Sequence, residues 1–427
     1  MSSPLFVAGE LSRRGLLASP LAGAAPGLVP ARTAPAALAA PTDPVLHSEV
    51  GEAGGVAALD TDAVVPLDQL PDEVKTAGGT PPVGQGELVY NVQDFGAVGD
   101  GVTDDLAAIN AAIDAAVASY GGTIWFPRGI YQVSGSIGRA GGLAAIAIRG
   151  AGELATRIRA TTNAPIITGA WDTCRLENLI LDGAYLGSPC ISAHIDKTTF
   201  EGLQLYGWTG YGIRLNDGTF GDLGLLNRIQ RCNIDQCTGI GIWASYRLID
   251  SWIVENNIGS SETNISVEGG PLRILANHLD GSPQTNIELR GNRRITIANN
   301  IMEGARKQSL VYTMPAWLTS DLAEIQIVGN AISNGGKAAA NTYPAIQITG
   351  VSTTARTTGF NVTGNIFACE DAGAGWTHCV QATNVTALAV VGNQWATGHM
   401  NAKPVRAVGS TAYEVIGNHG DNAVKTT

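Results

Sequence analysis

The chain has 427 residues and a formal net charge of −11, with 15% charged residues and 54 glycines. An acidic chain lacks the basic surface that nucleic acid requires, so we exclude DNA and RNA as partners. Few charges together with many glycines predict sheet with tight turns, because the exposed helices of an α/β enzyme carry more Lys, Glu and Arg.

Residues 1–41 predict an export signal. Arg13 and Arg14 precede a run rich in Ala, Leu, Pro and Gly, which ends in small residues before Pro41. This pattern resembles a twin-arginine signal peptide with its cleavage site. No later stretch has the roughly 20 consecutive apolar residues that a transmembrane helix needs. We therefore predict a secreted protein that does not insert into a membrane.

Residues 42–86 are rich in Pro, Gly, Ala and Asp without steady periodicity, which is typical of a flexible linker. Within this linker, Gly55–Pro71 resembles a short segment found in phage tail-fibre and tailspike proteins ahead of the receptor-binding part. The resemblance supports an alternative function, in which a tailspike-like protein binds glycans without catalysis.

Residues 87–132 predict an N-terminal cap. Leu106, Ile109, Ile113 and Val117 lie on one face of a predicted helix. The order Asp-Phe-Gly-Ala-x-Gly-Asp-Gly-x-x-Asp-Asp, a helix, and Phe-Pro-x-Gly-x-Tyr resembles the opening of the pectate-lyase superfamily, which includes relatives of glycoside hydrolase family 28. The resemblance implies a right-handed parallel β-helix whose first coil is covered by a capping helix.

A repeated pattern runs through residues 133–420 and predicts an all-β solenoid. Asn256, Asn277 and Asn300 follow apolar alternation at intervals of 21 and 23 residues, which suits one coil of short strands and turns. Asn tolerates left-handed backbone, and its amide can bond the equivalent Asn of the next coil. The remaining markers are Asn178, Gly202, Asn233, Asn330, Asn365, Asn393 and Asn418. Residues 421–427 are predicted to form a tail.

Six cysteines occur as three closely spaced pairs: Cys174 with Cys190, Cys232 with Cys237, and Cys369 with Cys379. In an exported protein this spacing predicts two or three local disulfides, and buried free thiols are the alternative. Neither the cysteines nor the six histidines show metal-ligand spacing, so we predict no metal and no cofactor.

Stacked coils would place equivalent residues about 4.8 Å apart. Asp280 and Glu303 are equivalent, because each lies three residues after a marker Asn and directly before a Gly. Two carboxylates about 5 Å apart suit a retaining glycosidase or a glycosyl transferase. The alternative is that both acids only cap surface turns.

The run Arg247–Tyr312 resembles the central coils of the inulin fructotransferases, which are trimeric β-helix enzymes that use an Asp and a Glu. The resemblance implies catalytic roles for Asp250 and Glu268, although an insertion around Ser260–Ile265 lengthens their spacing. A homotrimer is a further expectation for the enzyme and for the tailspike-like alternative, because β-helices packed side by side bury one flank of each. The four motifs with which family 28 hydrolyses polygalacturonate in successive coils are missing, which argues against a polygalacturonase.

Basic and aromatic side chains near these acids are predicted to bind substrate: Arg290, Arg306, Lys307, Trp252, Trp317 and Tyr312. The alternatives are ion pairs for the basic residues and packing for the aromatic ones. We predict an exported enzyme that cleaves or transfers glycosidic bonds of a polysaccharide. A lyase is the second possibility; it would abstract a proton beside a uronate carboxyl group neutralised by Ca²⁺.

Overall fold

The structure is a computed structural model that describes residues 88–187, 189–219, 223–291, 293–315, 322–351, 357–371, 374–395, 404–419 and 424–426. The predicted export signal, the predicted linker and Trp317 lie outside the described residues. The chain divides at Gly84 into two units, and all described residues belong to the second, Gln85–Thr427.

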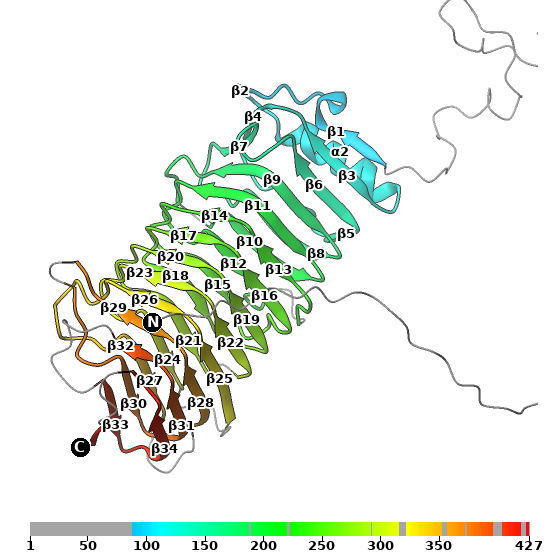
Figure 1. Cartoon of the computed structure of the whole chain (residues 1–427). Helices are drawn as coiled ribbons and strands as arrows, with labels where there is room; N and C mark the ends of the chain where they lie inside the picture. The colour runs from blue at the N-terminus through cyan, green and yellow to red at the C-terminus, as the bar shows by residue number, and fades with distance from the viewer. Residues whose placement is uncertain are drawn as a thin grey trace, which may run out of the picture. The chain divides into compact units, whose positions relative to one another are not determined.

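The second unit is an all-β parallel solenoid in which each strand pairs with its counterpart one coil away (Figure 1). Its strands form a 23-stranded sheet and a 12-stranded sheet. The larger sheet covers two faces of the coil. We call the strands before the marker Asn face 1, the strands after it face 2, and the 12-stranded sheet face 3. The predicted all-β solenoid is confirmed.

The strands of faces 1 and 2 are short and nearly all lie on one face only. Face 1 contains β1 (Val89–Asn91), β3 (Gly122–Phe126), β6 (Ile146–Gly150), β13 (Arg228–Gln230), β16 (Ser251–Val254), β19 (Leu272–Leu275), β22 (Ile295–Ala298), β25 (Leu322–Val328), β28 (Thr357–Thr363), β31 (Val385–Val391) and β34 (Thr411–Ile416). Face 2 contains β2 (Asp100–Asp104), β4 (Gly129–Val133), β7 (Thr156–Ala160), β14 (Asn233–Ile234), β17 (Asn257–Gly259), β20 (His278–Asp280), β23 (Ile301–Glu303), β26 (Ala331–Ser333), β29 (Ile366–Ala368) and β32 (Gln394–Trp395). Two longer strands, β9 (Arg175–Asp182) and β11 (Thr199–Tyr206), run through both faces.

Face 3 is one continuous ladder of parallel strands. It contains β5 (Leu143–Ala144), β8 (Ile167–Asp172), β10 (Ile191–Asp196), β12 (Ile213–Leu215), β15 (Ile240–Ala244), β18 (Thr263–Val267), β21 (Thr285–Arg290), β24 (Leu310–Thr313), β27 (Ile346–Thr349), β30 (Val380–Thr383), β33 (Val405–Val408) and β35 (Val424–Thr426). Because β35 pairs with β33, the solenoid extends into residues that the sequence assigned to a tail.

Two helical segments precede the first complete coils: the 3₁₀ helix η3 (Val92–Phe95) and the helix α2 (Leu106–Ala118). Helix α2 buries Ile109 and Ile113 of the predicted apolar face, together with Ala112 and Ala116. The other two predicted residues, Leu106 and Val117, are half-buried. Asp104 Oδ1 accepts a hydrogen bond from the Leu106 backbone N at 3.2 Å, near the start of the helix. That α2 serves to cap the solenoid stays a prediction. No helix among the described residues is long and apolar enough to cross a membrane.

The core is built from alternating side chains that stack on their equivalents. Ile253, Ile274 and Ile297 occupy one inward column of face 1 and are fully buried. At the turn between faces 1 and 2, each marker Asn from Asn256 onward is bonded to the next through its side chain. The predicted Asn ladder is therefore present.

The predicted disulfides are absent. All six cysteines are free thiols, and every one except Cys369 is buried. A whole strand separates the partners of two predicted pairs, since β9 lies between Cys174 and Cys190 and β14 lies between Cys232 and Cys237. Burial raises the pKa of the Cys232 thiol to about 12. These cysteines behave as small core residues.

Candidate active site

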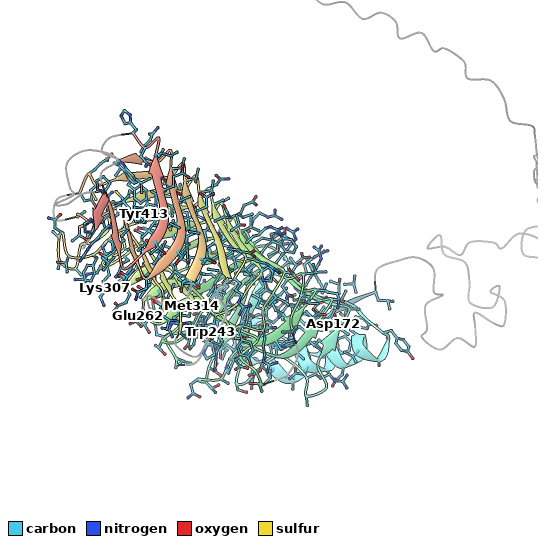
Figure 2. All side chains as sticks on the ribbon, turned by 90° about the horizontal axis from the view of Figure 1, so that it is seen from below. Asp172, Trp243, Glu262, Lys307, Met314 and Tyr413 are labelled. Atoms are coloured by element: carbon cyan, nitrogen blue, oxygen red, sulfur yellow. The ribbon has the colours of Figure 1, made fainter. Side chains whose placement is uncertain are left out.

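Face 3 carries polar and aromatic side chains on its outer surface in two parallel rows. The first row contains Ser192, Arg214, Trp243, Ser266, Glu288, Val311, Gln347, Gln381 and Arg406. The second row includes His194, Glu268, Arg290, Thr313, Thr349 and Thr383. Figure 2 shows side chains along the whole stack and labels Asp172 and Trp243. Strand alternation produces these rows, since inward apolar residues separate the outward ones.

Two of the predicted residues, Glu268 and Arg290, meet in a pocket of about 610 Å³ at the edge of face 3. They occupy matching positions of adjacent coils, one residue beyond the paired Val267 and Leu289. Tyr246 and Arg293 line the same pocket. The predicted neighbourhood of acid and arginine is therefore present around Glu268.

Glu288 completes the charged group beside this pocket. Arg290 donates to Glu288 Oε1 from Nη2 at 2.9 Å and from Nε at 3.1 Å, while Ser266 Oγ lies 3.2 Å from Glu288 Oε2. The expected alternative for Arg290, an ion pair with Glu288, is thus formed. Both oxygens of the Glu288 carboxylate therefore have hydrogen-bond partners, which fix its orientation.

Asp250 lies in a second pocket of about 350 Å³, which Arg273 and Glu324 also line. Gly270 lines the first pocket and Pro271 the second, so the Gly270–Pro271 turn stands between Asp250 and Glu268. The structure therefore places these two acids in neighbouring pockets and does not bring them into one.

Trp252 projects from face 1 and not from face 3. Its ring lies under two guanidinium groups, with the Arg228 Cζ 4.5 Å and the Arg273 Cζ 5.4 Å from the ring centroid. All three residues are direct neighbours in the strand register. The Trp252 ring is thus already engaged in cation–π contacts within the protein.

Asp280 and Glu303 lie at the opposite edge of face 3, where face 2 ends. Both point outward, and the pairing of Leu279 with Met302 puts them in adjacent coils at the same position. A Cβ placed on Gly304 would lie 3.2 Å from Asp280 Oδ1, so the Asp280 carboxylate reaches the coil that carries Glu303. The predicted register is present.

The surroundings of this pair are polar. Asn334 Nδ2 donates to Glu303 Oε1 at 3.2 Å. Arg306 and Lys307 follow in the next turn, and their backbone N–H groups bond Ser282 and Gln284 of the preceding coil at 2.8 and 3.0 Å. The ten predicted residues are thus spread over the two edges of face 3, face 1 and the core. Trp317 lies outside the described residues.

Tyr312 is a core residue, which corrects the predicted role in substrate binding. It is 1% exposed and packs edge-to-face against Phe360, with ring centroids 4.9 Å apart. Burial raises the pKa of its hydroxyl to about 12. The side chain points inward because it alternates with the outward Val311 and Thr313 on β24.

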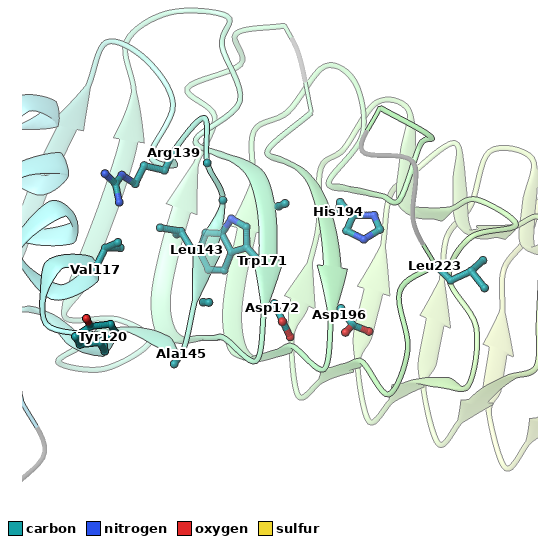
Figure 3. A pocket seen from close by; sticks show the side chains of 14 residues that line it. Val117, Tyr120, Arg139, Leu143, Ala145, Trp171, Asp172, His194, Asp196 and Leu223 are labelled. Carbon is teal, nitrogen blue, oxygen red and sulfur yellow. The ribbon is translucent and has the colours of Figure 1, made fainter.

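A further pocket of about 570 Å³, which we call the N-terminal pocket, was not predicted (Figure 3). Tyr120, Arg139, Asp172, His194 and Asp196 line it. These residues come from the end of α2, a loop and two strands, so no local motif unites them. The available signal was the interval of 24 residues (196 − 172) between the two acids, which is one coil.

The pKa of Asp196 lies below its usual value. Burial acts to raise this pKa, but hydrogen bonds from the Lys197 ammonium group and from the Leu225 backbone N, the latter at 2.7 Å, outweigh burial. Asp196 is therefore ionised in the N-terminal pocket at neutral pH. Within the described ranges, no group of three or more His, Cys, Asp or Glu residues is placed to hold a metal ion.

Two family descriptions match the chain. "Rhamnogalacturonase A/epimerase, pectate lyase-like" matches residues 89–174, and "Right handed beta helix region" matches residues 190–367. Mannuronan C5-epimerase AlgE5 of Azotobacter vinelandii is 70% identical over 46 residues, which is 11% of this chain and 5% of the epimerase. Alginate lyase 7 of the same organism is 62% identical over 48 residues, or 11% of this chain and 6% of the lyase.

Solved structures share the fold over most of the chain. The A-module of A. vinelandii mannuronan C-5 epimerase AlgE6 is 20% identical, with 76% of this chain and 99% of that chain covered and a TM-score of 0.54. The catalytic unit of a GH87 α-1,3-glucanase from Streptomyces thermodiastaticus is 16% identical (82% and 71% covered, TM-score 0.58). The Dettilon tailspike protein is 14% identical (79% and 68%, TM-score 0.57). The predicted resemblance to pectate-lyase-like β-helix proteins is confirmed.

Proposed function

Starting from a pectate-lyase-like right-handed β-helix, we propose that this chain is an exported enzyme that binds a polysaccharide along face 3 and cleaves or transfers its glycosidic bonds. The observation that carries the proposal is the convergence of Glu268, Glu288 and Arg290 from adjacent coils beside a pocket of about 610 Å³. The names of the similar proteins support a polysaccharide as the substrate without selecting the reaction, since they include a mannuronan epimerase, an alginate lyase and an α-1,3-glucanase.

The two carboxylates differ in environment, as an acid and a base in one site must. Arg290 and Ser266 hold Glu288. Glu268 lines the pocket itself together with Tyr246, whose ring centroid lies 5.1 Å from the Arg247 Cζ. Glu288 pairs with Ser266, two residues before Glu268, so the two acids lie diagonally across adjacent coils. One coil rise and two residues along a strand separate their backbones by about 8 Å.

Carboxyl groups held at this backbone spacing would suit an inverting mechanism, in which the two carboxyl groups stand roughly 6.5–9.5 Å apart and leave room for a water molecule. Glu268 would protonate the leaving oxygen, and Glu288 would take a proton from the attacking water on the other side of the ring. Arg290 would hold the Glu288 carboxylate in place through its two hydrogen bonds.

The Asp280–Glu303 pair is a second candidate for the same reaction. Its members occupy directly matching positions of adjacent coils, about 4.8 Å apart, which suits a retaining mechanism. The two candidates therefore differ in the anomeric configuration of the first product. Proton NMR of the product formed within the first minutes separates them, because inversion supports Glu268 with Glu288 and retention supports Asp280 with Glu303.

The lyase alternative is favoured by the two arginines of the same pocket, Arg290 and Arg293, which could hold a uronate carboxyl group. A lyase would form unsaturated products that absorb in the ultraviolet, and only with added Ca²⁺. This result would show that the chain cleaves by elimination and not by hydrolysis. Tight glycan binding without any product from a panel of plant, fungal and bacterial polysaccharides would instead support the tailspike-like alternative.

Export and trimer formation belong to the same proposal. The twin-arginine pattern supports export, and cleavage near Ala40, read by mass spectrometry of the mature protein, is the expected result. Association is supported by an apolar row on the outer surface of face 1, where Val254, Leu275, Ala298 and Val328 are neighbours in the register. Light scattering should then report three times the monomer mass.

A further inference from the structure

We propose that the N-terminal pocket is a second sugar-binding subsite, which takes an uncharged pyranose residue of the polysaccharide that reacts further along face 3. This inference rests on the proposed function, because it assumes that face 3 is the substrate surface. The pocket has about 570 Å³, which lies within the range of roughly 300–1,000 Å³ typical of small-molecule sites.

One part of the pocket lining is small and aromatic, and another part carries carboxylates. Gly142, Ala145 and Ala170 supply small groups to the lining. Val117 comes from the last turn of α2 and Tyr120 directly follows the helix (Figure 3). Small residues leave space for a ring to approach the backbone. The carboxylates of Asp172 and Asp196 stand on the far side, where they can accept hydrogen bonds from hydroxyl groups.

Tyr120 is the unusual member of this set. Its side chain is 96% exposed, and its φ of 64° is in the left-handed region, where glycine or asparagine is the ordinary residue after a helix. A tyrosine there contributes little packing and carries a backbone cost. An exposed ring at the rim of a pocket is a suitable surface for the C–H face of a pyranose.

The charges around the pocket favour an uncharged sugar. Lys197 pairs with Asp196 and lies 3.5 Å from Asp172, and Arg139 pairs with Asp114 at 3.0 Å. The nearby cations are thus already engaged by carboxylates. Because one lysine faces two carboxylates, a net negative charge remains on Asp172, Asp196 and Lys197. A uronate would meet this charge, whereas a hydroxyl group can donate to the carboxylates.

The N-terminal pocket lies on the same surface as the proposed reaction centre. His194 lines it from β10, and Glu268 follows β18, three steps further along the ladder of face 3. Three coil rises amount to about 14 Å. One extended glycan of several residues can therefore occupy both places, so the pocket should strengthen binding of long substrates only.

The test uses the full-length protein with Tyr120→Gly, Tyr120→Phe and the control Tyr185→Gly. Tyr185 is also exposed and left-handed (φ 59°), but it lies outside the pocket. The probes are neutral oligosaccharides of α-1,3-glucan, β-1,4-glucan and galactan in short and long forms, with alginate oligosaccharides as the anionic counterpart. Isothermal titration calorimetry gives the dissociation constants, and thermal unfolding gives the melting temperature.

We expect Tyr120→Gly to weaken binding of a long neutral oligosaccharide at least tenfold, with an equal or higher melting temperature. Tyr120→Phe and Tyr185→Gly should bind like the wild type, and short oligosaccharides should show no difference between variants. Unchanged binding by Tyr120→Gly, a fall in melting temperature that accounts for the loss, tighter binding of alginate, or no binding of any neutral probe would each overturn the proposal. Each titration reads binding and not product formation, so absence of catalysis leaves this result readable.

Discussion

The side-chain oxygen of Asn300 accepts two hydrogen bonds from Asn277, one from the backbone N at 2.9 Å and one from Nδ2 at 3.0 Å. Asn277 Nδ2 also donates to the carbonyl of Ile253 at 3.0 Å. Each marker Asn from Asn256 to Asn393 therefore ties its coil to both neighbours while every polar atom of its amide has a partner. This contact holds adjacent coils in the register on which the outer rows of face 3 depend.

Replacing Asn300 by Ala should destabilise the solenoid strongly. The substitution leaves two buried N–H donors of Asn277 without an acceptor, and each such orphan costs about 1–3 kcal/mol. Urea denaturation followed by circular dichroism should show a loss of about 2–5 kcal/mol. Asn257→Ala is the matched control, since its amide bonds Asn233 on the exposed surface. Equal effects of the two substitutions would contradict the ladder as a source of stability.

Replacing Glu268 by Gln should lower kcat by about 10²–10⁴, because removal of a general acid or base has this typical effect. Glu288→Gln should act similarly, while Glu414→Gln, an exposed acid of face 1, serves as control. Initial rates on the polysaccharide that gives product measure the effect. If Asp280→Asn and Glu303→Gln abolish turnover while Glu268→Gln retains it, the reaction belongs to the second pair.

Tyr312→Ala should unfold the protein more easily and should not act on substrate. Truncating a large buried aromatic side chain costs about 3–5 kcal/mol. Tyr312→Phe keeps the edge-to-face contact with Phe360 and should lose far less. Below its melting temperature, the Ala variant should retain the wild-type KM. A raised KM with unchanged stability would restore Tyr312 to the binding surface.

The cysteines should resist alkylation in the folded protein. Burial raises the pKa of Cys174 to about 11 and that of Cys237 to about 12, so few thiolates exist at pH 8 and reagents cannot reach them. Mass spectrometry after iodoacetamide should find at most Cys369 modified in the native state and all six thiols modified in denaturant. Dithiothreitol should leave the melting temperature unchanged. A fall in melting temperature on reduction would show that disulfides form after all.

Asp196 should make folding stability depend on pH. Its folded-state pKa is lowered, so its contribution is complete above the ordinary value of 3.8 and disappears as pH falls through the lower folded-state value. Asp196→Asn should destabilise at pH 7 by about 1 kcal/mol, since the Leu225 N–H loses a charged acceptor. The difference between variant and wild type should shrink below about pH 4. A constant difference from pH 7 to pH 3 would contradict this assignment.

Periodicity determined the fold directly from the sequence. A marker Asn recurs once per coil, with inward Ile, Leu and Val around it. A stack of coils lets each Asn amide bond the next one and buries these apolar neighbours. The same regularity predicted the equivalence of Asp280 and Glu303, because residues at fixed offsets from the marker must stack. Side chains of face 2 near the marker were thus readable from the sequence.

Tertiary structure decided the positions that lie far from the marker. Turns of varying length intervene before face 3, so the sequence does not reveal whether a residue such as Tyr312 points inward or outward. The lengths of these turns also decide that Glu268 meets Arg290 while Asp250 lies in the neighbouring pocket. The N-terminal pocket depends on the packing of a helix end against coils that are distant in the sequence. Within one strand, alternation alone decides which side chains point inward. The register between strands of different faces depends on the turns that join them, and the packing of the whole coil sets these turns.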